Sequence, residues 1–303
     1  MTLYLNSYKD FFNLETFQFL FATTFHTFKK YPMRVITTMH NFSLPKMNYM
    51  KYITLLLLIF VILYAIHHSI PSNNVINTSS FIRNELPIYS VNTQEPVVAL
   101  TFDSAWGTED LEQILSILEK HHAPATFFVT GEWAKKNPEA IITIDRAGHE
   151  IANHGTSHKH MPQISREEMI EEIRSCHNTV YDLIQKDMTL FRAPYSDWSD
   201  AVVDIAQSMG YSAINQSVDS LDWKDYGVDA IVHTVCEHKN LQNGSIILLH
   251  NGATYTKDAL DIMLTKLEEQ GYSFITVSSL IYTSNYYLDH TGKQFLKQDS
   301  ATP

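Results

Sequence analysis

Cysteine is scarce in this sequence, which has only two cysteines, Cys176 and Cys236, among 303 residues. Their wide separation excludes a C-x-x-C redox motif, and two cysteines are too few for a disulfide scaffold. We therefore expect ordinary, mostly buried thiols, with one disulfide between them as the alternative in a domain outside the cytoplasm. The hydrophobic content of 45% indicates that a globular core stabilises the chain instead.

Positive charge is also scarce, because 22 Lys and Arg residues face 33 Asp and Glu residues and the formal net charge is −11. No basic cluster occurs after residue 68. Nucleic-acid binding needs a basic face, so the sequence excludes nucleic acid as the main partner. Neutral or cationic substrates fit this composition better.

Long apolar runs are limited to one, residues 52–66, which is apolar apart from Thr54 and two tyrosines. The run is shorter than the roughly 20 residues that span a bilayer, and it has the length of a signal-peptide core. No small-x-small cleavage pattern follows it. We interpret residues 50–68 as an uncleaved transmembrane anchor, with a cleaved signal sequence as the alternative.

Basic residues are unevenly distributed around this run. None occurs after it until Arg83, whereas six precede it: Lys9, Lys29, Lys30, Arg34, Lys46 and Lys51. The positive-inside rule then places the C-terminal bulk outside the cytoplasm, on the cell membrane, or secreted if the segment is cleaved. Residues 1–49 lack helix caps and turn signals. A reading frame that starts too far upstream would explain why this segment shows no domain pattern. Residues 69–94, rich in Ser, Asn and Thr, read as a linker.

From residue 95 onward, short apolar runs alternate with longer helical patterns, which is typical of β-α units. The predicted strands are residues 97–102, 125–129, 150–153, 189–192, 212–215, 245–249 and 273–277. The predicted helices are residues 110–121, 133–146, 165–185, 199–209, 228–239 and 257–270. The pattern predicts one α/β domain over residues 95–283, a distorted (β/α) barrel of about seven strands, followed by an unstructured tail over residues 284–303.

Polar residues follow several of these strands. Asp103 ends the first apolar run, where the active sites of such barrels lie, although a lone Asp there often caps the next helix. His154 and His158 follow the third strand, and two histidines four residues apart can bind one metal ion. Since the chain has 15 histidines, this spacing alone is weak evidence.

The later strand ends carry titratable groups as well. Arg192 follows the fourth strand, Asp222 and Trp223 follow the fifth, and Leu248 and His250 close the sixth. Each residue alone has an ordinary interpretation, a surface salt bridge for the arginine and a buried hydrogen-bonded side chain for the histidine. Their order at successive strand ends indicates one common site.

The chain thereby resembles the polysaccharide deacetylases of carbohydrate esterase family 4, the NodB homology domain, over about residues 95–283. The matching motifs are TFD at 101–103, H-x-x-x-H at 154–158, RAPY at 192–195, DSLDW at 219–223 and LLH at 248–250. The resemblance implies metal-dependent removal of N-acetyl, or sometimes O-acetyl, groups from a sugar polymer. Peptidoglycan, a chitin-like polymer and poly-N-acetylglucosamine are the expected substrates.

The resemblance also implies a role for each motif residue. His154 and His158 would hold a divalent metal ion, Zn²⁺ first, with Co²⁺ or Ni²⁺ as alternatives, and Asp103 would be the general base. Arg192 would orient that base, and His250 would protonate the leaving amine.

The remaining motif residues would support the acid and contact the sugar. Asp222 would hold His250 in place. Trp223 and Leu248 would form the wall of the acetyl pocket, while Tyr195 and Trp106 would stack on sugar rings. The backbone N–H of Tyr195 would stabilise the oxyanion.

One position departs from the family pattern. The family usually has a second Asp after TFD as a metal ligand, and this chain has Ser104, followed by Trp106 and Gly107 in a TFD-x-x-WG variant that resembles the spore-associated branch. A neutral hydroxyl is a poorer ligand than a carboxylate. An alternative is therefore a carbohydrate-binding pseudoenzyme that has lost its metal, and another is a hydrolase of different amides, such as a cyclic ureide.

Overall fold

The computed structural model describes residues 58–59 and 86–297, and nearly all of these belong to a compact unit within Ser80–Pro303. The predicted N-terminal segment, almost all of the predicted anchor over 50–68 and most of the linker lie outside the described residues. Among the residues that are described, no helix is both long and apolar enough to cross a membrane.

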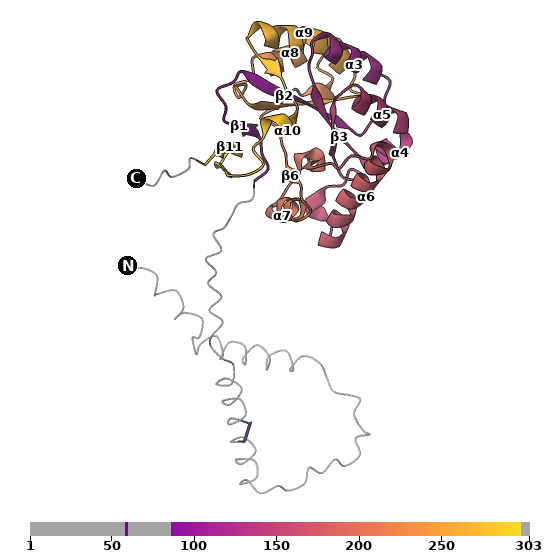
Figure 1. The fold of residues 1–303 in the computed structure, drawn as a ribbon, viewed down its shortest axis with the longest axis vertical. Helices are drawn as coiled ribbons and strands as arrows, with labels where there is room; N and C mark the ends of the chain where they lie inside the picture. Colours follow the sequence, from indigo (N-terminus) through magenta and orange to yellow (C-terminus); the bar gives the residue numbers. More distant parts are fainter. Residues whose placement is uncertain (1–57, 60–85, 298–303) are drawn as a thin grey trace, which may run out of the picture. The chain divides into compact units, whose positions relative to one another are not determined.

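A parallel sheet forms the centre of the domain (Figure 1). Its middle strands are β8 (Ser245–His250), β2 (Val97–Ser104), β3 (Ala125–Val129) and β4 (Glu150–Asn153), in that spatial order. All eight residues of β2 are buried. Apolar runs are typical of parallel strands that are covered on both faces, which explains why β2, β3 and β8 were predictable.

Shorter strands extend this sheet on both sides. They are β5 (Leu190–Phe191), β6 (Ser212–Ala213), β7 (Val218–Asp219), β9 (Ser273–Phe274) and β1 (Ser90–Val91). Ile88 bridges to Ile214 beyond β6, and the adjoining β1 pairs with β8 on the other side. The segment over residues 88–91 therefore links both sides of a strongly curved sheet. The predicted α/β barrel class is confirmed as a half-barrel, whereas seven strands is too few, because the sheet of the described domain has 11.

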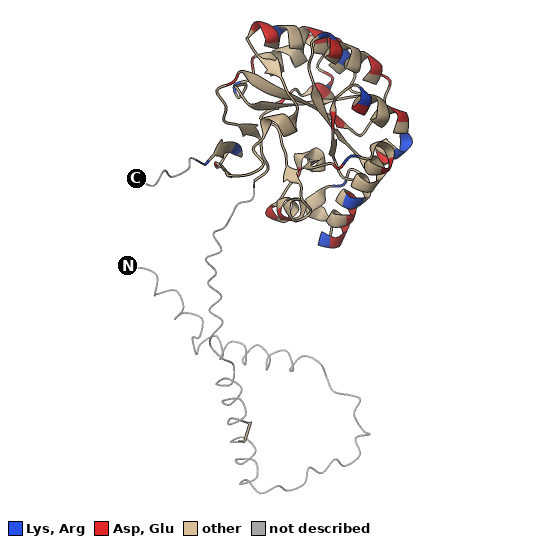
Figure 2. Ribbon diagram, viewed as in Figure 1, with Lys and Arg blue, Asp and Glu red and all other residues tan. Residues whose placement is uncertain are grey.

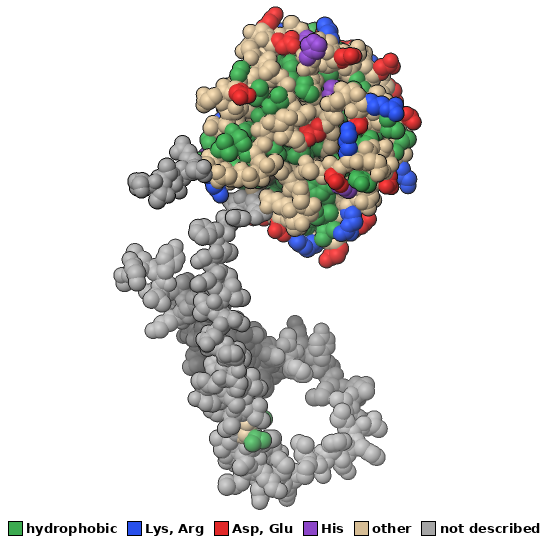
Figure 3. Space-filling model, in the orientation of Figure 1, with side chains coloured by type: hydrophobic (Ala, Val, Ile, Leu, Met, Phe, Trp, Pro, Cys, Tyr) green, Lys and Arg blue, Asp and Glu red, His purple; other side chains and the backbone are tan. Residues whose placement is uncertain are grey.

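Amphipathic helices form an outer layer around the sheet (Figure 1). They are α3 (Leu111–Lys120), α4 (Gly131–Lys136), α5 (Pro138–Arg146), α6 (Arg166–Ile184), α7 (Asp200–Ser208), α8 (Val228–Cys236), α9 (Thr256–Glu269) and α10 (Val277–Leu280). Helix α3 buries Leu111, Ile114, Leu115 and Leu118, the spacing of one helix face. Most charged residues lie on the helices (Figure 2), and acidic and basic side chains intermingle on the face shown in Figure 3.

The helix predicted over residues 133–146 is two helices. Pro138 begins α5 directly after Asn137, which ends α4. Proline lacks an N–H and fits only the first turn of a helix, so the chain breaks there. The strand predicted over 273–277 is also shorter, because the Thr276 side chain accepts a hydrogen bond from the backbone of Ser279 and starts α10.

The predicted domain boundaries need two corrections. Strand β1 belongs to the sheet, so the linker predicted over 69–94 extends too far. The unstructured tail predicted over 284–303 is wrong for residues 286–296, where β10 (Tyr286–Leu288) and β11 (Lys293–Leu296) form a hairpin that pairs with β1. Strands β1, β10 and β11 have two to four residues, and their sequences show neither an apolar run nor a clear alternation.

The two cysteines are unpaired and buried, as expected. Cys176 lies in α6 and Cys236 in α8. Burial raises the pKa of Cys176 to about 12 and also raises that of Cys236, so both stay protonated and unreactive at neutral pH.

Candidate active site

Alternation along β2 explains how Asp103 reaches the interior of the half-barrel. Val98, Leu100 and Phe102 belong to one hydrophobic cluster, whereas Val97 and Ala99 belong to the other. Successive side chains of a strand point to opposite faces, so Asp103 follows the series of Val97 and Ala99. The sequence thus places a carboxylate on the inner face at the carboxyl end of the central strand.

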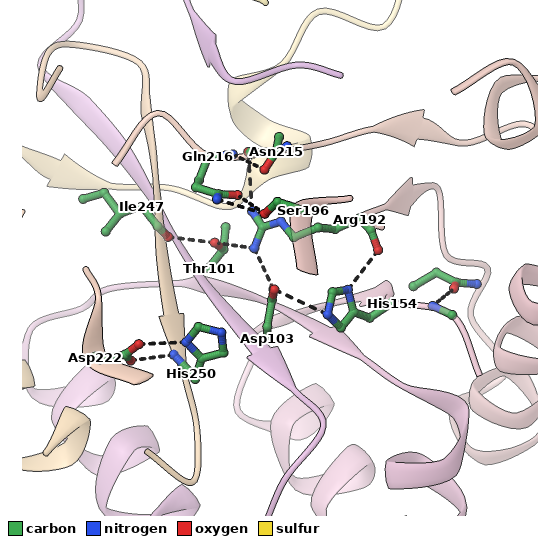
Figure 4. Close-up of polar contacts among 12 residues, drawn as sticks. Thr101, Asp103, His154, Arg192, Ser196, Asn215, Gln216, Asp222, Ile247 and His250 are labelled. Atoms are coloured by element: carbon green, nitrogen blue, oxygen red, sulfur yellow. Dashed lines mark hydrogen bonds and ion pairs between the residues drawn. The ribbon is translucent and has the colours of Figure 1, made fainter. Parts of the chain in front are cut away.

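Asp103 and His250 are register partners on the adjacent parallel strands β2 and β8. Neighbouring strands lie about 4.8 Å apart, so this pairing brings the predicted base and the predicted acid to one edge of the sheet. Figure 4 shows Asp103 between Arg192 and His154, with His250 and Asp222 beside it.

Arg192, at the end of β5, has no exposed surface. Its Nη1 donates to Asp103 Oδ1 at 2.7 Å and to Thr101 Oγ1 at 2.9 Å, and its guanidinium lies 4.1 Å from the centre of the Phe128 ring. Burial raises the pKa of Asp103, but the positive charge of Arg192 and the neighbouring histidines outweigh it, so the pKa is lowered overall. Asp103 is therefore a carboxylate at neutral pH.

The two histidines of the H-x-x-x-H motif lie next to this carboxylate. His154 Nδ1 donates to the backbone oxygen of Arg192 at 2.8 Å, so neutral His154 carries its lone pair on Nε2. Burial lowers the pKa of His154, and burial together with the charge of His154 lowers that of His158 to about 4. Both rings are neutral at pH 7, which is the form that binds metals, and their centroids lie 5.1 Å apart.

The donor atoms can be tested for their fit to a divalent ion. His154 Nε2 lies 3.4 Å from Asp103 Oδ2, so two acceptors face each other, and the carboxylate would attract a cation held by this nitrogen. Ser104 Oγ is buried and has no hydrogen-bond partner in the described domain. Within residues 58–59 and 86–297, however, no three His, Cys, Asp or Glu side chains group as a metal site. Two neutral imidazoles and a hydroxyl would therefore hold a divalent ion only weakly.

His250 is held by a buried carboxylate. Asp222 begins the short helix η3 (Asp222–Lys224), and its Oδ1 accepts from His250 Nδ1 at 2.7 Å. Asp222 Oδ2 accepts from the His250 backbone at 2.8 Å and from Thr256 Oγ1 at 2.6 Å. Burial lowers the pKa of His250, but the hydrogen bond and charge of Asp222 raise it more. The protonated ring is favoured, which suits a general acid.

Partly exposed aromatic side chains lie around these residues, and rings of this kind are common at binding surfaces. Trp106 stacks on His250 with centroids 5.1 Å apart, Tyr195 packs against His158 at 4.4 Å, and Trp223 is half exposed. A cavity of about 310 Å³ opens beside Trp106 and His158. Leu248 is buried in β8.

Several residues that contact the predicted site are not among the predicted site residues. His160 stacks on Tyr195 at 4.0 Å and hydrogen-bonds Asp197 at 2.8 Å, while Thr256 binds Asp222. Thr101 could have been found, because it shares the inner face of β2 with Asp103. The other contacts join residues that are far apart in the chain, so no local sequence pattern predicts them.

Comparison with known proteins identifies the family. The model for polysaccharide deacetylase matches residues 90–214. A peptidoglycan-N-acetylglucosamine deacetylase of Bacillus cereus is 34% identical over 198 residues, which cover 64% of this chain and 92% of that protein. The chain belongs to the polysaccharide deacetylase family. The predicted resemblance to that family is thereby confirmed.

Two further relatives in this family bear on function. The uncharacterized protein YlxY of Bacillus subtilis is 31% identical over 195 residues, but the match covers only 60% of that protein. The crystal structure of BA3943 from Bacillus anthracis, described as a CE4 family pseudoenzyme, matches with a TM-score of 0.62 and 34% identity over 65% of this chain and 69% of that chain. A mutant of BA3943 is described as having restored enzymatic activity.

The contact between Asp222 and His250 predicts the behaviour of the histidine. In Asp222→Asn the negative charge disappears, so the pKa of His250 should fall and the ring should lose its proton at lower pH. The stability that protonated His250 contributes is present below the unfolded pKa of about 6.5 and is lost as pH rises through the raised folded value. NMR titration of the His250 ring measures this shift.

Asp225→Asn is the matched control, because Asp225 lies exposed at the end of the same short helix. It should leave the titration of His250 unchanged. An unchanged His250 titration in Asp222→Asn would contradict the assigned role of Asp222.

Proposed function

We propose that this protein is a metal-dependent hydrolase that removes N-acetyl groups from a cell-wall or extracellular polysaccharide. The observation that carries the proposal is the pairing of an ionised carboxylate, Asp103, with a histidine that favours its protonated form, His250, on adjacent strands. Amide hydrolysis needs both a base and an acid. Family membership and the exposed aromatic residues around the site support a sugar polymer as the substrate.

In this mechanism, water attacks the acetyl carbonyl and Asp103 accepts the proton. The Oδ2 atom performs this step, because Oδ1 accepts from Arg192. Arg192 keeps the carboxylate ionised and prevents it from turning. The neutral nitrogens of His154 and His158, with Ser104 as a weaker third ligand, would hold a divalent ion, Zn²⁺ first, that would acidify water and polarise the carbonyl.

The second half of the reaction breaks the C–N bond and releases acetate and a free amine. His250 gives its proton to the departing nitrogen from Nε2, since Nδ1 is bound to Asp222. The backbone N–H of Tyr195 would stabilise the oxyanion. Trp223 and Leu248 would enclose the acetyl methyl group, while Trp106 and Tyr195 would contact the sugar rings.

A carbohydrate-binding pseudoenzyme is the second candidate. Ser104 stands where the family usually has a metal-binding carboxylate, and the described residues form no group of three charged or imidazole ligands. The similarity to BA3943 is a further observation in its favour. The retained base, acid and arginine favour the enzyme, because sugar binding alone requires none of them.

Substitution of the base and the acid tests the proposed enzyme. His250→Asn should lower turnover by about 10²- to 10⁴-fold, with the fold preserved. Asp103→Asn should lower turnover similarly and also reduce the free energy of unfolding, because it leaves Arg192 buried without its partner, a loss of about 3–5 kcal/mol. Acetate release from peptidoglycan, chitin oligomers and poly-N-acetylglucosamine measures activity, and urea denaturation measures stability.

His233→Asn on the exposed surface of α8 serves as the control, and its activity should equal that of the unmodified protein. If His250→Asn retains full turnover, His250 is not the acid. If the unmodified protein releases no acetate with added metal, the pseudoenzyme is the better description.

Position 104 provides a separate test of the metal site. Ser104→Asp should raise the affinity for Zn²⁺ or Co²⁺, because a carboxylate adds negative charge and a conventional third ligand. The unmodified protein should bind the ion weakly and lose activity on mild chelation. Metal titration by calorimetry compares the two proteins side by side.

Ser116→Asp is the matched control, since it adds the same charge on the exposed face of α3. Its metal affinity should equal that of the unmodified protein. Tight stoichiometric binding by the unmodified protein would contradict a weak site.

We further propose that residues 50–68 anchor the chain and that the domain lies outside the cytoplasm. The apolar run and the basic residues before it support this placement. Protease added to osmotically supported cells without walls should then degrade the domain. Protection until lysis would contradict this topology, and free domain in the medium with a processed N-terminus would indicate a cleaved signal.

A further inference from the structure

Glu172 on α6 is a buried carboxylate that the proposed mechanism does not use; 7% of its surface is exposed. Its Oε2 accepts from the backbone N–H groups of Thr156 and Ser157 at 2.8 and 2.7 Å, and its Oε1 accepts from Ser157 Oγ at 2.5 Å. In return, Thr156 Oγ1 donates to the backbone oxygen of Glu172 at 2.8 Å. One side chain thus binds the segment between the two motif histidines at three points.

The carbonyl groups of the same segment are bound from the other side. Gly155 O accepts from the Gly131 backbone at 2.9 Å and Thr156 O from the Glu132 backbone at 3.0 Å, both in the first turn of α4. These donors are free at the start of a helix. The segment is therefore held between the N-terminus of α4, which supplies donors, and Glu172, which supplies acceptors.

The residue that follows this segment has a costly backbone conformation. His158 has a φ of 56°, in the left-handed region that disfavours residues other than glycine. Such residues persist when the surrounding structure determines them, and they gather at functional sites. Directly before His158 in the chain, Ser157 is fixed by two hydrogen bonds to Glu172.

We propose that Glu172 is a positioning residue that holds His158 in its left-handed conformation, with its ring beside that of His154. This inference rests on the proposed function, in which the two rings share an ion. Glu172 stays ionised, because hydrogen bonds from Ser157 and Thr156 lower its pKa against the effect of burial, and Lys159 Nζ lies 3.5 Å away. Its role is to fix the geometry of the histidines, and it contacts neither substrate nor ion.

Three variants test the role of Glu172. Glu172→Ala removes every acceptor, whereas Glu172→Gln keeps an oxygen that can accept both backbone N–H groups. Glu171→Gln is the matched control, because Glu171 precedes Glu172 on α6 and its side chain is 68% exposed. Hydrogen exchange, the NMR signal of the His158 ring and Co²⁺ affinity are measured for each, with the first two on metal-free protein.

We expect Glu172→Ala to increase exchange at the amides of Thr156 and Ser157 by at least about tenfold and to move the His158 signal toward that of free histidine. Co²⁺ affinity should fall by about 10- to 100-fold, the usual effect of losing a residue that orients a ligand. Glu172→Gln should lie between Glu172→Ala and the unmodified protein, and Glu171→Gln should match the latter.

Two results would overturn the inference. One is faster exchange in Glu172→Ala with an unchanged His158 signal, because Glu172 would then only attach a loop to a helix. The other is an unchanged exchange rate at both amides. If the unmodified protein binds no Co²⁺, the proposed metal dependence fails, while the exchange rates and the His158 signal still decide the role of Glu172.

Discussion

The buried ion pair between Arg192 and Asp103 is the interaction on which the site depends. A guanidinium with no exposed surface must have its charge compensated inside the protein, and Asp103, Thr101 and the Phe128 ring together do so. The same arginine uses its backbone oxygen to fix the ring of His154. One residue at the end of β5 therefore orients both the proposed base and one proposed metal ligand, which is possible only if β2, β4 and β5 keep their register.

This arrangement gives Asp103 two roles that require different pKa values. As the partner of Arg192 it must be ionised, and its lowered pKa secures that. As a base it works best with a pKa near the operating pH, so a low value makes it a weak proton acceptor. A weak base is sufficient if the pKa of the attacking water is lowered, and a bound divalent ion would lower it. The ion pair and the proposed ion thus complement each other.

The sequence predicts those parts of the molecule whose signal is local. Strands β2, β3 and β8 contain apolar runs. The polar residues at the ends of the parallel strands could be interpreted as one site, because parallel strands end at the same edge of a sheet. Strand β1 and the hairpin of β10 and β11 are too short to show a period, and their pairing joins distant parts of the chain. The contacts of Glu172 and the left-handed conformation of His158 arise from tertiary packing, so the sequence shows the histidines but not what holds them.

The charge balance at the strand ends shows what Ser104 changes. Asp103 and Arg192 neutralise each other, and His154 and His158 are neutral, so a divalent ion would add two uncompensated positive charges in a buried place. A second aspartate would cancel one of them, and burial makes this difference larger than it would be in water. With serine, the residues around the proposed ion supply no further negative charge. The loss of this one carboxylate therefore accounts for the weak binding that we propose for the ion, and it acts through charge as well as through the number of ligands.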